Sequence, residues 1–383
     1  MKRILVTNFH PHRGGGGGHT SYVRTILQSD LRVEFALAVA APEGSGVWEA
    51  GVTLGVPTFV CDFPGNIKEV LHVVRAVRRF EQICREWSPD LVHVNGARDQ
   101  GIVVFWKHFY RRGVPCVRAH LAVRCIPDNS FNRWSYQRMV QGHVYVGHSA
   151  KNISWADGFL RPRNARVIPV GVDVDFWKPG PKDPSSLEKN GLAPTDFVFG
   201  SHAGMGRHKR TDLFLRAAAL ALRRGAQPFK ALLRGKDDEV QASQELAAEL
   251  GLKDIIYVRY EPDPRGYLSL IDVGFILSDI EAISFAAREL MAMGKPLISS
   301  NYAGLVENVD DGLNGRLVEC GDVEGVAEAI AWFLQLDADS LRRLGRNARE
   351  KAEQVFTLER QVQGLSRFYR DILLERDTTL SSA

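Results

Sequence analysis

Basic side chains gather in residues 204–212, which read GMGRHKRTD and lie between an apolar run and an amphipathic segment. Four consecutive side chains there carry or can carry positive charge: Arg207, His208, Lys209 and Arg210. A guanidinium grips phosphate oxygens in pairs, and an ammonium attracts them as a point charge. The segment therefore indicates an anion site after a strand. A solvated basic loop is the alternative interpretation.

Two glutamates belong to residues 281–292, which read EAISFAARELMA and follow the apolar run VGFILS. This pattern predicts a helix that ends at Gly294. The unpaired amides at the start of the helix, near residues 284–287, can bind an anion. A carboxylate is the natural acceptor for the cis-diol of a ribose. A helix-surface charge for Glu289 and a dipole-compensating charge for Glu281 are the alternatives.

A glycine-rich loop, RGGGGGH at residues 13–19, follows the first apolar run. Glycines let a backbone approach a ligand closely and leave the amides of a following helix free for an anion. The dinucleotide fingerprint is not met, because the sixth position from Gly14 holds His19, and the Gly-Lys-Ser/Thr of a P-loop is absent. A loop that binds nothing is the alternative. His10, His12 and His19 lack an acidic partner and predict no metal site.

One histidine, His120, directly follows a predicted strand at residues 114–119. The carboxyl end of a strand is where ligands bind in open α/β sheets, so His120 is a candidate ligand-binding or acid/base group. A packing role is the alternative. His93 lies within a predicted strand, and we expect it to pack in the core.

Apolar runs alternate with helix-period segments along the chain, which favours parallel sheets covered by helices on both faces. The clearest helical period spans residues 66–87. The predicted strands are residues 4–9, 33–39, 58–61, 91–95, 114–119 and 144–147, followed by 197–201, 231–234, 255–258, 273–277, 296–300 and 315–318. Residues 176–196 interrupt this alternation with Pro, Gly and no periodicity, which is typical of a linker.

The length of 383 residues favours two domains, at roughly 100–200 residues each. The fold class that we expect is α/β, with two doubly wound Rossmann-like domains facing each other across a cleft. The expected boundaries are a first domain at 1–173, a linker at 174–196, a second domain at 197–357 and a final helical segment at 358–383.

The composition is that of a soluble globular protein, with 45% hydrophobic and 25% charged residues. A net charge of +4 is too balanced for a nucleic-acid coat but suits an anionic ligand. No signal peptide and no bilayer-spanning stretch are predicted. The five cysteines are scattered, which argues against a disulfide scaffold or a Cys-based zinc site. We therefore expect a cytoplasmic protein.

Taken in order along the chain, these motifs resemble the retaining GT-B glycosyltransferases of the family 4 type. The family's Glu–seven residues–Glu stretch is matched by Ser278, Glu281, Glu289, Met291, Ala292, Gly294 and Pro296. A later Gly-rich stretch is matched at Gly304, Glu307, Asp311, Gly312, Asn314 and Gly315. PVGVD at 169–173 and PDLVH at 89–93 are similar to two more family segments. The first glycine loop matches the loop on the acceptor side.

This resemblance implies a nucleotide-diphosphate sugar donor, UDP- or GDP-linked, held mostly by the second domain, and a hydroxyl acceptor that is a glycan, a lipid-linked or a small molecule. It implies a catalytic set of Arg207 and Lys209 on the diphosphate, Glu281 on the donor sugar and His120 beside the transferred sugar. It also implies a donor-binding set: Gly17, Gly18, Ser284, Phe285, Ala286 and Glu289. A metal or other cofactor is not required in the family, and its last helix returns to the first domain.

In that family the leaving phosphate is usually proposed to act as base for a front-face attack. The chain departs from the family at residues 282–284, where Ala-Ile-Ser replaces Gly-Phe-Gly, and at Arg288, where an apolar residue is usual. Two alternatives stay open: a GT-B nucleotide-sugar epimerase that uses the same type of donor, and, because of the first departure, a degenerate sugar-nucleotide-binding subunit without transfer activity.

A peripheral membrane contact is a separate hypothesis. Residues 101–112, GIVVFWKHFYRR, mix aromatic and basic side chains, and arginines recur on the predicted helix 66–87. A basic aromatic surface could dock on anionic lipid at the inner face of the membrane. The alternative is that residues 103–106 belong to the core and the cations are solvated.

Overall fold

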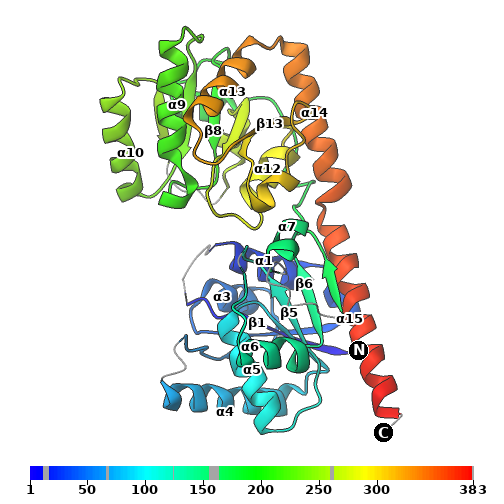
Figure 1. The fold of residues 1–383 in the computed structure, drawn as a ribbon. Helices are drawn as coiled ribbons and strands as arrows, with labels where there is room; N and C mark the ends of the chain where they lie inside the picture. The colour runs from blue at the N-terminus through cyan, green and yellow to red at the C-terminus, as the bar shows by residue number, and fades with distance from the viewer. Residues whose placement is uncertain (12–16, 66–68, 124, 155–163, 259–262, 382–383) are drawn as a thin grey trace. The chain divides into compact units, whose positions relative to one another are not determined.

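The computed structural model describes residues 1–11, 17–65, 69–123, 125–154, 164–258 and 263–381. They divide into two compact units (Figure 1): Met1–Val170 together with Leu358–Ala383, and Gly171–Thr357. Each unit contains one sheet, and every strand pair recorded in the described residues is parallel. Parallel strands need crossover helices, which explains the alternation seen along the sequence.

The first unit has a seven-stranded sheet with the order β3-β2-β1-β4-β5-β6-β7. Its strands are β1 (Arg3–Thr7), β2 (Ala36–Ala41), β3 (Thr58–Val60), β4 (Leu91–Val94), β5 (Cys116–His120), β6 (Gly142–Tyr145) and β7 (Ala165–Val167). Its helices are α1 (Gly18–Gln28), α2 (Leu31–Glu34), α3 (Gly46–Thr53), α4 (Val70–Trp87), α5 (Ala97–Phe109), α6 (Ser130–Trp134), the π-helix η1 (Ser135–Met139), α7 (His148–Ser154) and α15 (Leu358–Ser381).

The second unit has a six-stranded sheet with the order β10-β9-β8-β11-β12-β13. Its strands are β8 (Val198–Ser201), β9 (Lys230–Arg234), β10 (Ile255–Val258), β11 (Val273–Ile276), β12 (Leu297–Ser300) and β13 (Gly315–Val318). Its helices are α8 (Pro184–Lys189), the 3₁₀ turn η2 (Arg207–Lys209), α9 (Thr211–Arg223), α10 (Asp237–Glu249), α11 (Arg265–Ser269), α12 (Phe285–Ala292), the 3₁₀ turn η3 (Ala303–Glu307), α13 (Val323–Gln335) and α14 (Ala338–Val355).

Each sheet has one switch point, where the chain stops adding strands on one side of the sheet and continues on the other side of its first strand. In the first unit the chain winds outward from β1 on one side and from β4 on the other, and β8 and β11 play the same parts in the second unit. The loops that leave these strands diverge at the carboxyl edge, which opens a crevice where ligands bind in such sheets. The loops after β1, β4, β8 and β11 are therefore the places to look for a site.

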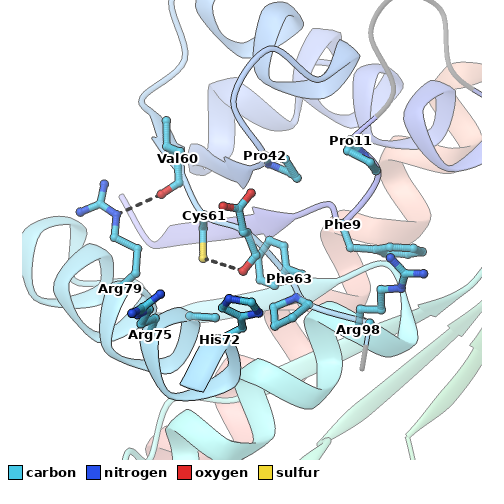
Figure 2. A pocket seen from close by; sticks show the side chains of 14 residues that line it. Phe9, Pro11, Pro42, Val60, Cys61, Phe63, His72, Arg75, Arg79 and Arg98 are labelled. Atoms are coloured by element: carbon cyan, nitrogen blue, oxygen red, sulfur yellow. Dashed lines mark hydrogen bonds between the residues drawn. The ribbon is translucent and has the colours of Figure 1, made fainter. Parts of the chain in front are cut away.

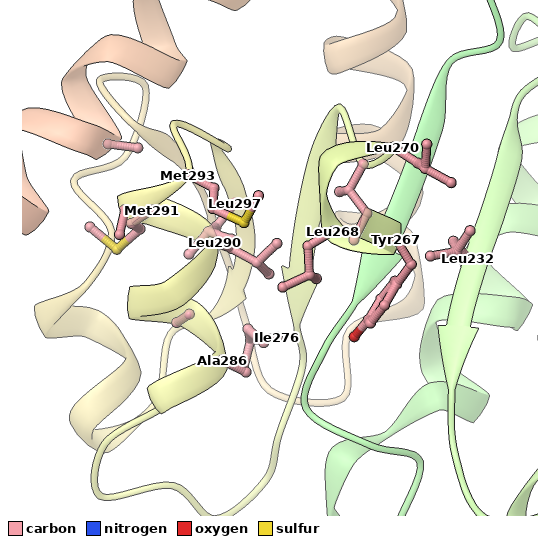
Figure 3. Packing of buried hydrophobic residues seen from close by; sticks show 14 of the residues in the cluster. Leu232, Tyr267, Leu268, Leu270, Ile276, Ala286, Leu290, Met291, Met293 and Leu297 are labelled. Atoms are coloured by element: carbon pink, nitrogen blue, oxygen red, sulfur yellow. The ribbon is translucent and has the colours of Figure 1, made fainter. Parts of the chain in front are cut away.

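Helix α12 is held against the second sheet by its apolar face. Leu290 and Met291 are fully buried, and they belong to one cluster with Leu268 and Leu297 (Figure 3). The helix stops where Gly294 adopts a left-handed conformation with φ of 71°. Burial of one face fixes the rotation of α12, so Glu289 points to the side of the helix away from Leu290.

Helix α15 packs on the sheet of the first unit, although it follows the second unit in sequence. Phe368 and Tyr369 are buried, and the Tyr369 hydroxyl lies 2.5 Å from Nδ1 of His93. His93 itself is fully buried in β4, so the expectation that it packs in the core is confirmed. Burial lowers the pKa of His93 to about 3, which keeps the imidazole neutral at physiological pH.

The structure differs from the sequence-based expectation in three segments. Residues 174–196, expected to be a linker, belong to the second unit and include α8, because Leu187 and Leu192 are buried in its core. Residues 33–39 begin with the end of α2, and Val33 is 76% exposed. Strand β7 was not predicted, since its three residues sit at the sheet edge and none of them is fully buried.

Residues 101–112 divide between core and surface, since Phe109 is 68% exposed and His108, Arg111 and Arg112 are exposed as well. Val103 and Trp106 are buried, and the Lys107 ammonium, also buried, donates to the carbonyl of Met139 at 2.7 Å. Arg112 forms an ion pair with Glu81. Most apolar side chains of α5 therefore face the core, and the exposed part of this segment is smaller than the sequence suggests. The membrane contact stays a prediction. Within the described residues, no helix combines the length and the apolar character needed to cross a bilayer.

Candidate functional site

The loops that follow β8 and β11 are joined at the carboxyl edge of the second sheet. The Asp279 amide donates to the carbonyl of His208 at 3.0 Å. The Lys209 ammonium contacts a carboxylate oxygen of Glu281 at 2.5 Å, and both side chains are mostly buried. Two residues that the sequence places 72 positions apart are thus brought together, because β8 and β11 are neighbours in the sheet.

Two arginines of the β8–α9 loop have different surroundings. Arg210, in the left-handed conformation with φ of 54°, pairs with Asp212 and with Asp279. The hydrogen bonds to Asp212 and then to Asp279 raise its pKa above the ordinary value, although burial opposes them. Arg207 is exposed, and its side chain has no ion pair or hydrogen bond recorded within the described residues. Arg207 is therefore available to a ligand, whereas Arg210 braces the two loops.

A pocket of about 670 Å³ opens beside these arginines. Residues of the β8–α9 loop, of α10 and of the β11–α12 loop line it, Arg207 and Arg210 among them. The lining does not include Lys209, Glu281 or Glu289. The resemblance assigns Arg207 and Lys209 to the diphosphate. Arg207 lines this pocket, whereas Lys209 is paired with Glu281.

Glu289 lies in a polar group that the sequence did not reveal. Its carboxylate is 3.0 Å from Nε2 of His202, the residue that follows β8. The other ring nitrogen of His202, Nδ1, lies 2.9 Å from a guanidinium nitrogen of Arg234 and also contacts the Tyr267 hydroxyl. Since arginine can only donate, Nδ1 accepts and the proton sits on Nε2, which donates to Glu289.

This arrangement fixes one carboxylate oxygen of Glu289 and leaves the other for a ligand. The Glu289 side chain is 18% exposed, and no second hydrogen bond is recorded for it within the described residues. A buried, oriented carboxylate oxygen is a good acceptor for a hydroxyl group. His202 thus positions Glu289, while Arg234 and Tyr267 fix the ring of His202.

The side chain of Ser284 caps the N-terminus of α12. The Ser284 hydroxyl accepts from the Ala287 amide at 3.3 Å, and Ser284 has extended backbone angles. Within the described residues, the positive-φ positions do not include residues 282–284, so the backbone there does not require the glycines that the family has. Phe285 and Ala286 form the first turn of the helix, and the amides of such a turn have no partner within the helix.

Gly304 allows a second loop to approach this turn closely. A Cβ atom at Gly304 would lie 1.8 Å from the Ala282 carbonyl oxygen, and the Gly304 amide donates to the Glu281 carbonyl at 3.1 Å. Only glycine fits at this contact. The η3 turn thereby supports the loop that carries Glu281.

The unusual Arg288 is a structural residue. Its side chain is 1% exposed, its guanidinium lies 4.0 Å from the centre of the Phe356 ring, and its Nε donates to Asn308 at 3.3 Å. Burial lowers its pKa to about 10, against the opposing effect of Glu307. Arg288 therefore faces away from Glu289 and ties α12 to neighbouring segments of the second unit.

His120 ends β5 at the carboxyl edge of the first sheet and is 4% exposed. Its ring stacks on Tyr145 with centroids 4.2 Å apart, and its Nε2 lies 3.0 Å from Nδ1 of His143. Burial lowers the pKa of His143 to about 3, so His143 is neutral, and its Nε2 donates to the Tyr136 carbonyl at 3.3 Å. His143 Nδ1 must then accept, which places a proton on Nε2 of His120.

Gly17 and Gly18 begin helix α1, at the end of the loop that follows β1. Gly17 is the N-cap residue, and a Cβ atom there would meet nothing within 4 Å, so its backbone borders open space. Gly14 and His12 lie outside the described residues. The rings of His10 and His19 are 4.8 Å apart, and the described part of the chain has no group of three His, Cys, Asp or Glu side chains placed to hold a metal.

A separate pocket of about 620 Å³ opens at the carboxyl edge of β1 and β3 (Figure 2). Phe9 and Phe63 form part of its wall, and the Arg98 guanidinium lies 5.5 Å from the centre of the Phe9 ring. Arg79 donates to the Val60 carbonyl at 3.0 Å, and Arg75 is exposed. The cations of this pocket are partly hydrated, so their charge does not by itself require a ligand.

Sequence reasoning missed three residues of the Glu289 group: Tyr267, which lies in α11 and carried no sequence signal, and the pair His202 and Arg234. Both stand at the carboxyl ends of strands that the sequence predicts, at 197–201 and 231–234. The rule that singles out His120 would have found them. Applied to every predicted strand, it selects polar side chains at the edge where both sheets bind ligands.

Two family models match consecutive parts of the chain: the one described as Glycosyl transferases group 1 matches residues 183–351, and the one described as Glycosyltransferase Family 4 matches residues 16–176. A curated relative, N-acetyl-alpha-D-glucosaminyl L-malate synthase of Bacillus anthracis, is 30% identical over 145 residues, which are 38% of this chain and 38% of that protein. Three such relatives are matched over 38%, 57% and 50% of their own length, so the chain spans about half the length of these three proteins.

Solved structures cover nearly the whole chain. A glycosyltransferase from Rickettsia africae ESF-5 superposes with a TM-score of 0.84 at 20% identity, over 97% of this chain and 98% of that one. Anabaena Alr3699/HepE in complex with UDP superposes with a TM-score of 0.78 at 19% identity, over 97% and 100%. These likenesses show the fold. With both family models matched in their order along the chain, the chain belongs to the GT-B glycosyltransferases of the family 4 type.

Proposed function

We propose that the protein is a retaining glycosyltransferase that moves a sugar from a UDP- or GDP-linked donor to a hydroxyl group of an acceptor. One observation carries the proposal: the loops after β8 and β11 bring cations, the start of α12 and the oriented carboxylate of Glu289 to one edge of a doubly wound sheet. A nucleoside diphosphate needs these three elements, a carboxylate for its ribose and positive charge and amides for its phosphates.

The transfer breaks the bond between the anomeric carbon and the phosphate oxygen, and the nucleoside diphosphate leaves with the electron pair. The acceptor oxygen forms the new bond on the same face of the sugar, and its proton passes to the leaving phosphate. Negative charge therefore builds on the diphosphate in the transition state. Fixed cations that meet this charge lower the barrier, by roughly 3–4 kcal/mol for a well-placed donor.

Lys209 and Arg207 supply this charge in our proposal. An ammonium has three donors, and the contact with Glu281 uses one of them, so Lys209 retains donors for a phosphate oxygen. Arg207 reaches the diphosphate from the exposed turn η2. Glu281 holds Lys209 in place and contacts the donor sugar, together with the amides of Ser284, Phe285 and Ala286.

Glu289 binds the ribose through the carboxylate oxygen that His202 leaves unused. On the first unit, we assign His120 to the transferred sugar and the backbone of Gly17 and Gly18 to the diphosphate and the acceptor. His120 is buried at a strand end and its Nε2 proton is set by His143, which suits a fixed polar contact. No metal or other cofactor takes part in this proposal, because side chains provide the positive charge.

The degenerate-subunit alternative rests on the Ala-Ile-Ser sequence at 282–284. Ala282 and Ile283 are buried, and Ser284 caps α12, so these side chains have structural roles within the second unit. This supports a loop that keeps its shape without the usual glycines. The epimerase alternative predicts conversion of the sugar nucleotide without any acceptor.

A donor panel tests the proposal. UDP- and GDP-linked sugars are first screened for thermal stabilisation, and release of the nucleoside diphosphate is then followed with mixed hydroxyl acceptors, with and without EDTA. Acceptor-dependent release at equal rates in both conditions is expected, with NMR showing the donor's anomeric configuration retained in the product. Epimerised donor without transfer, an inverted product, or stabilisation without turnover in any mixture would each contradict part of the proposal.

A further inference from the structure

A buried arginine in the first sheet lacks a partner. Arg118, the third residue of β5, is 6% exposed. Its Nε and Nη1 atoms are enclosed and have no hydrogen-bond partner, and no ion pair of this side chain is recorded anywhere in the described residues. Placing a permanent charge out of water without a partner is strongly unfavourable, so such groups are retained where a ligand completes them.

No group around Arg118 forms an ion pair with it in the described residues. Asp99 is near enough for Arg118 to lower its pKa, but burial has the larger effect and raises the pKa of that carboxyl group. One oxygen of Asp99 accepts from Thr7 and from the Asn95 amide, and the two side chains form no ion pair. His93 and His143 also sense the arginine charge, and both are neutral. Arg118 therefore has one carboxyl group within electrostatic range but no hydrogen-bonded ion pair in the described residues.

Arg118 lines a pocket of about 410 Å³ at the carboxyl edge of β5, and His120 lines the same pocket. Asn132 and Tyr136 add polar groups to its wall, and Phe9 and Ile126 add apolar surface. All of these residues belong to the first unit. The pocket is large enough for a small organic molecule and has one dominant charge.

The approach of the β1 loop to this pocket depends on a glycine. A Cβ atom at Gly96 would lie 1.8 Å from the Phe9 ring, so only glycine lets that ring lie over the end of β4. Gly96, Phe9 and Arg118 all line the pocket. Phe9 thus contributes an aromatic face to the wall of the pocket that Arg118 also lines.

We propose that Arg118 binds an oxyanion group, a carboxylate or a phosphate, carried by the acceptor substrate. The inference rests on the proposed function and adds the chemical class of the acceptor: a small hydroxylated molecule with a negative charge. The donor diphosphate is the other source of an oxyanion, but the second unit has its own cations for it, Arg207 and Lys209. Arg118 belongs to the first unit, to which the proposed function assigns the acceptor.

Replacement of the charge by a side chain of similar length provides the first test. Arg118→Met should raise the melting temperature of the ligand-free protein, by about 2 °C or more, because it removes an unpaired buried charge. A structural arginine would behave in the opposite way, and a lower melting temperature of Arg118→Met overturns the inference. The control is Arg166→Met on β7, where the arginine is exposed and paired with Asp371; little change is expected there.

Anion binding provides the second test, with inorganic phosphate and malonate as probes and sodium chloride at equal ionic strength as the reference. Saturating UDP is present throughout, so that the donor site is occupied. At tens of millimolar, at least one probe should stabilise the wild type and the Arg166→Met control, and the stabilisation should be lost in Arg118→Met. No stabilisation of the wild type, or the same stabilisation in Arg118→Met, overturns the inference.

The affinity for UDP shows whether Arg118 binds the acceptor or the donor diphosphate. Binding and reaction of sugar nucleotides show separately whether the proposed function holds. The affinity for UDP alone should be the same within about twofold in wild type and Arg118→Met. A loss of tenfold or more would assign Arg118 to the donor diphosphate and overturn the acceptor assignment. Failure of the anion test with UDP binding intact leaves the proposed transfer in place, whereas failure of every sugar nucleotide to bind or react removes the proposed function.

Discussion

Replacement of Glu289 by alanine removes the carboxylate that we assign to the ribose. In the unliganded protein, one oxygen of this carboxylate accepts from His202 at 3.0 Å, and the side chain is 18% exposed. The second oxygen has no recorded partner in the described part of the chain. One hydrogen bond between a hydroxyl group and a charged oxygen is therefore at stake, together with the orientation that His202 imposes.

The size of the effect follows from that count. A hydrogen bond to a charged group contributes about 1.5–3 kcal/mol, which corresponds to roughly 10- to 150-fold in the dissociation constant of the nucleotide. At about 100 times its dissociation constant, UDP stabilises the wild type by about 2.7 kcal/mol. If affinity falls about 100-fold, the same UDP concentration adds only about 0.4 kcal/mol. For a unit of this size, the thermal shift should fall from about 5–11 °C to about 1–2 °C.

Differential scanning fluorimetry with UDP, and with the donor that the panel identifies, measures this shift. Glu328→Ala on α13 is the matched control, since Glu328 is an exposed helical glutamate of the same unit. It should show the full wild-type shift. A Glu289→Ala protein that is folded and still shows the full shift would refute the assignment of Glu289 to the nucleotide.

Three further predictions concern other parts of the molecule. Lys209→Ala should lower turnover by about 10²–10³-fold with a smaller effect on UDP affinity, since the charge of Lys209 acts mainly on the leaving group. The control Lys253→Ala should leave turnover and UDP affinity unchanged. Equal turnover in the two variants would exclude Lys209 from catalysis. Burial raises the pKa of Glu81, but hydrogen bonds from two arginines and an indole lower it more strongly, to about 2 from an ordinary value of 4.5. The stabilisation by Glu81 is therefore full above about pH 4.5 and is lost as the pH falls towards about 2. The melting temperature of Glu81→Gln should depend less on pH in that range than the melting temperature of the wild type. The same dependence on pH in both proteins would contradict the pairing of Glu81 with the two arginines. Most apolar side chains of α5, Trp106 among them, are buried, and within the described residues of this helix Phe109 is the one large apolar side chain that is exposed. Sedimentation should therefore recover equal amounts of protein with neutral and anionic vesicles, and selective binding to anionic vesicles would show that Phe109 and the exposed arginines of α4 suffice for docking.

Much of the fold could be predicted from the sequence because parallel strands buried on both faces are continuous apolar runs. The run 273–277 and the strand β11 differ by one residue, and 315–318 coincides with β13. Segments without this signal were harder. Strand β7 lies at a sheet edge with little apolar content. The Pro-rich stretch that includes α8 buries only Leu187 and Leu192 in a core, with Trp177 partly buried against the same cluster.

The sequence predicted site residues that lie within a single motif, but it did not predict the contacts between residues of different motifs. Glu281 and Lys209 lie in two segments that the sequence singles out, but their ion pair depends on the neighbouring positions of β8 and β11, which local sequence does not specify. The Glu289–His202 contact joins a helix to a strand end. Arg118 was hidden because a charged residue inside an apolar run reads as part of the strand, and its lack of partners is visible only in three dimensions.

A crystal structure of the protein with bound UDP tests the central claim most directly. The account predicts the ribose hydroxyl groups on the carboxylate of Glu289 and the diphosphate at Lys209, Arg207 and the first amides of α12. Well-defined UDP bound elsewhere, for instance in the pocket beside Phe63, with Glu289 still joined only to His202, would contradict it.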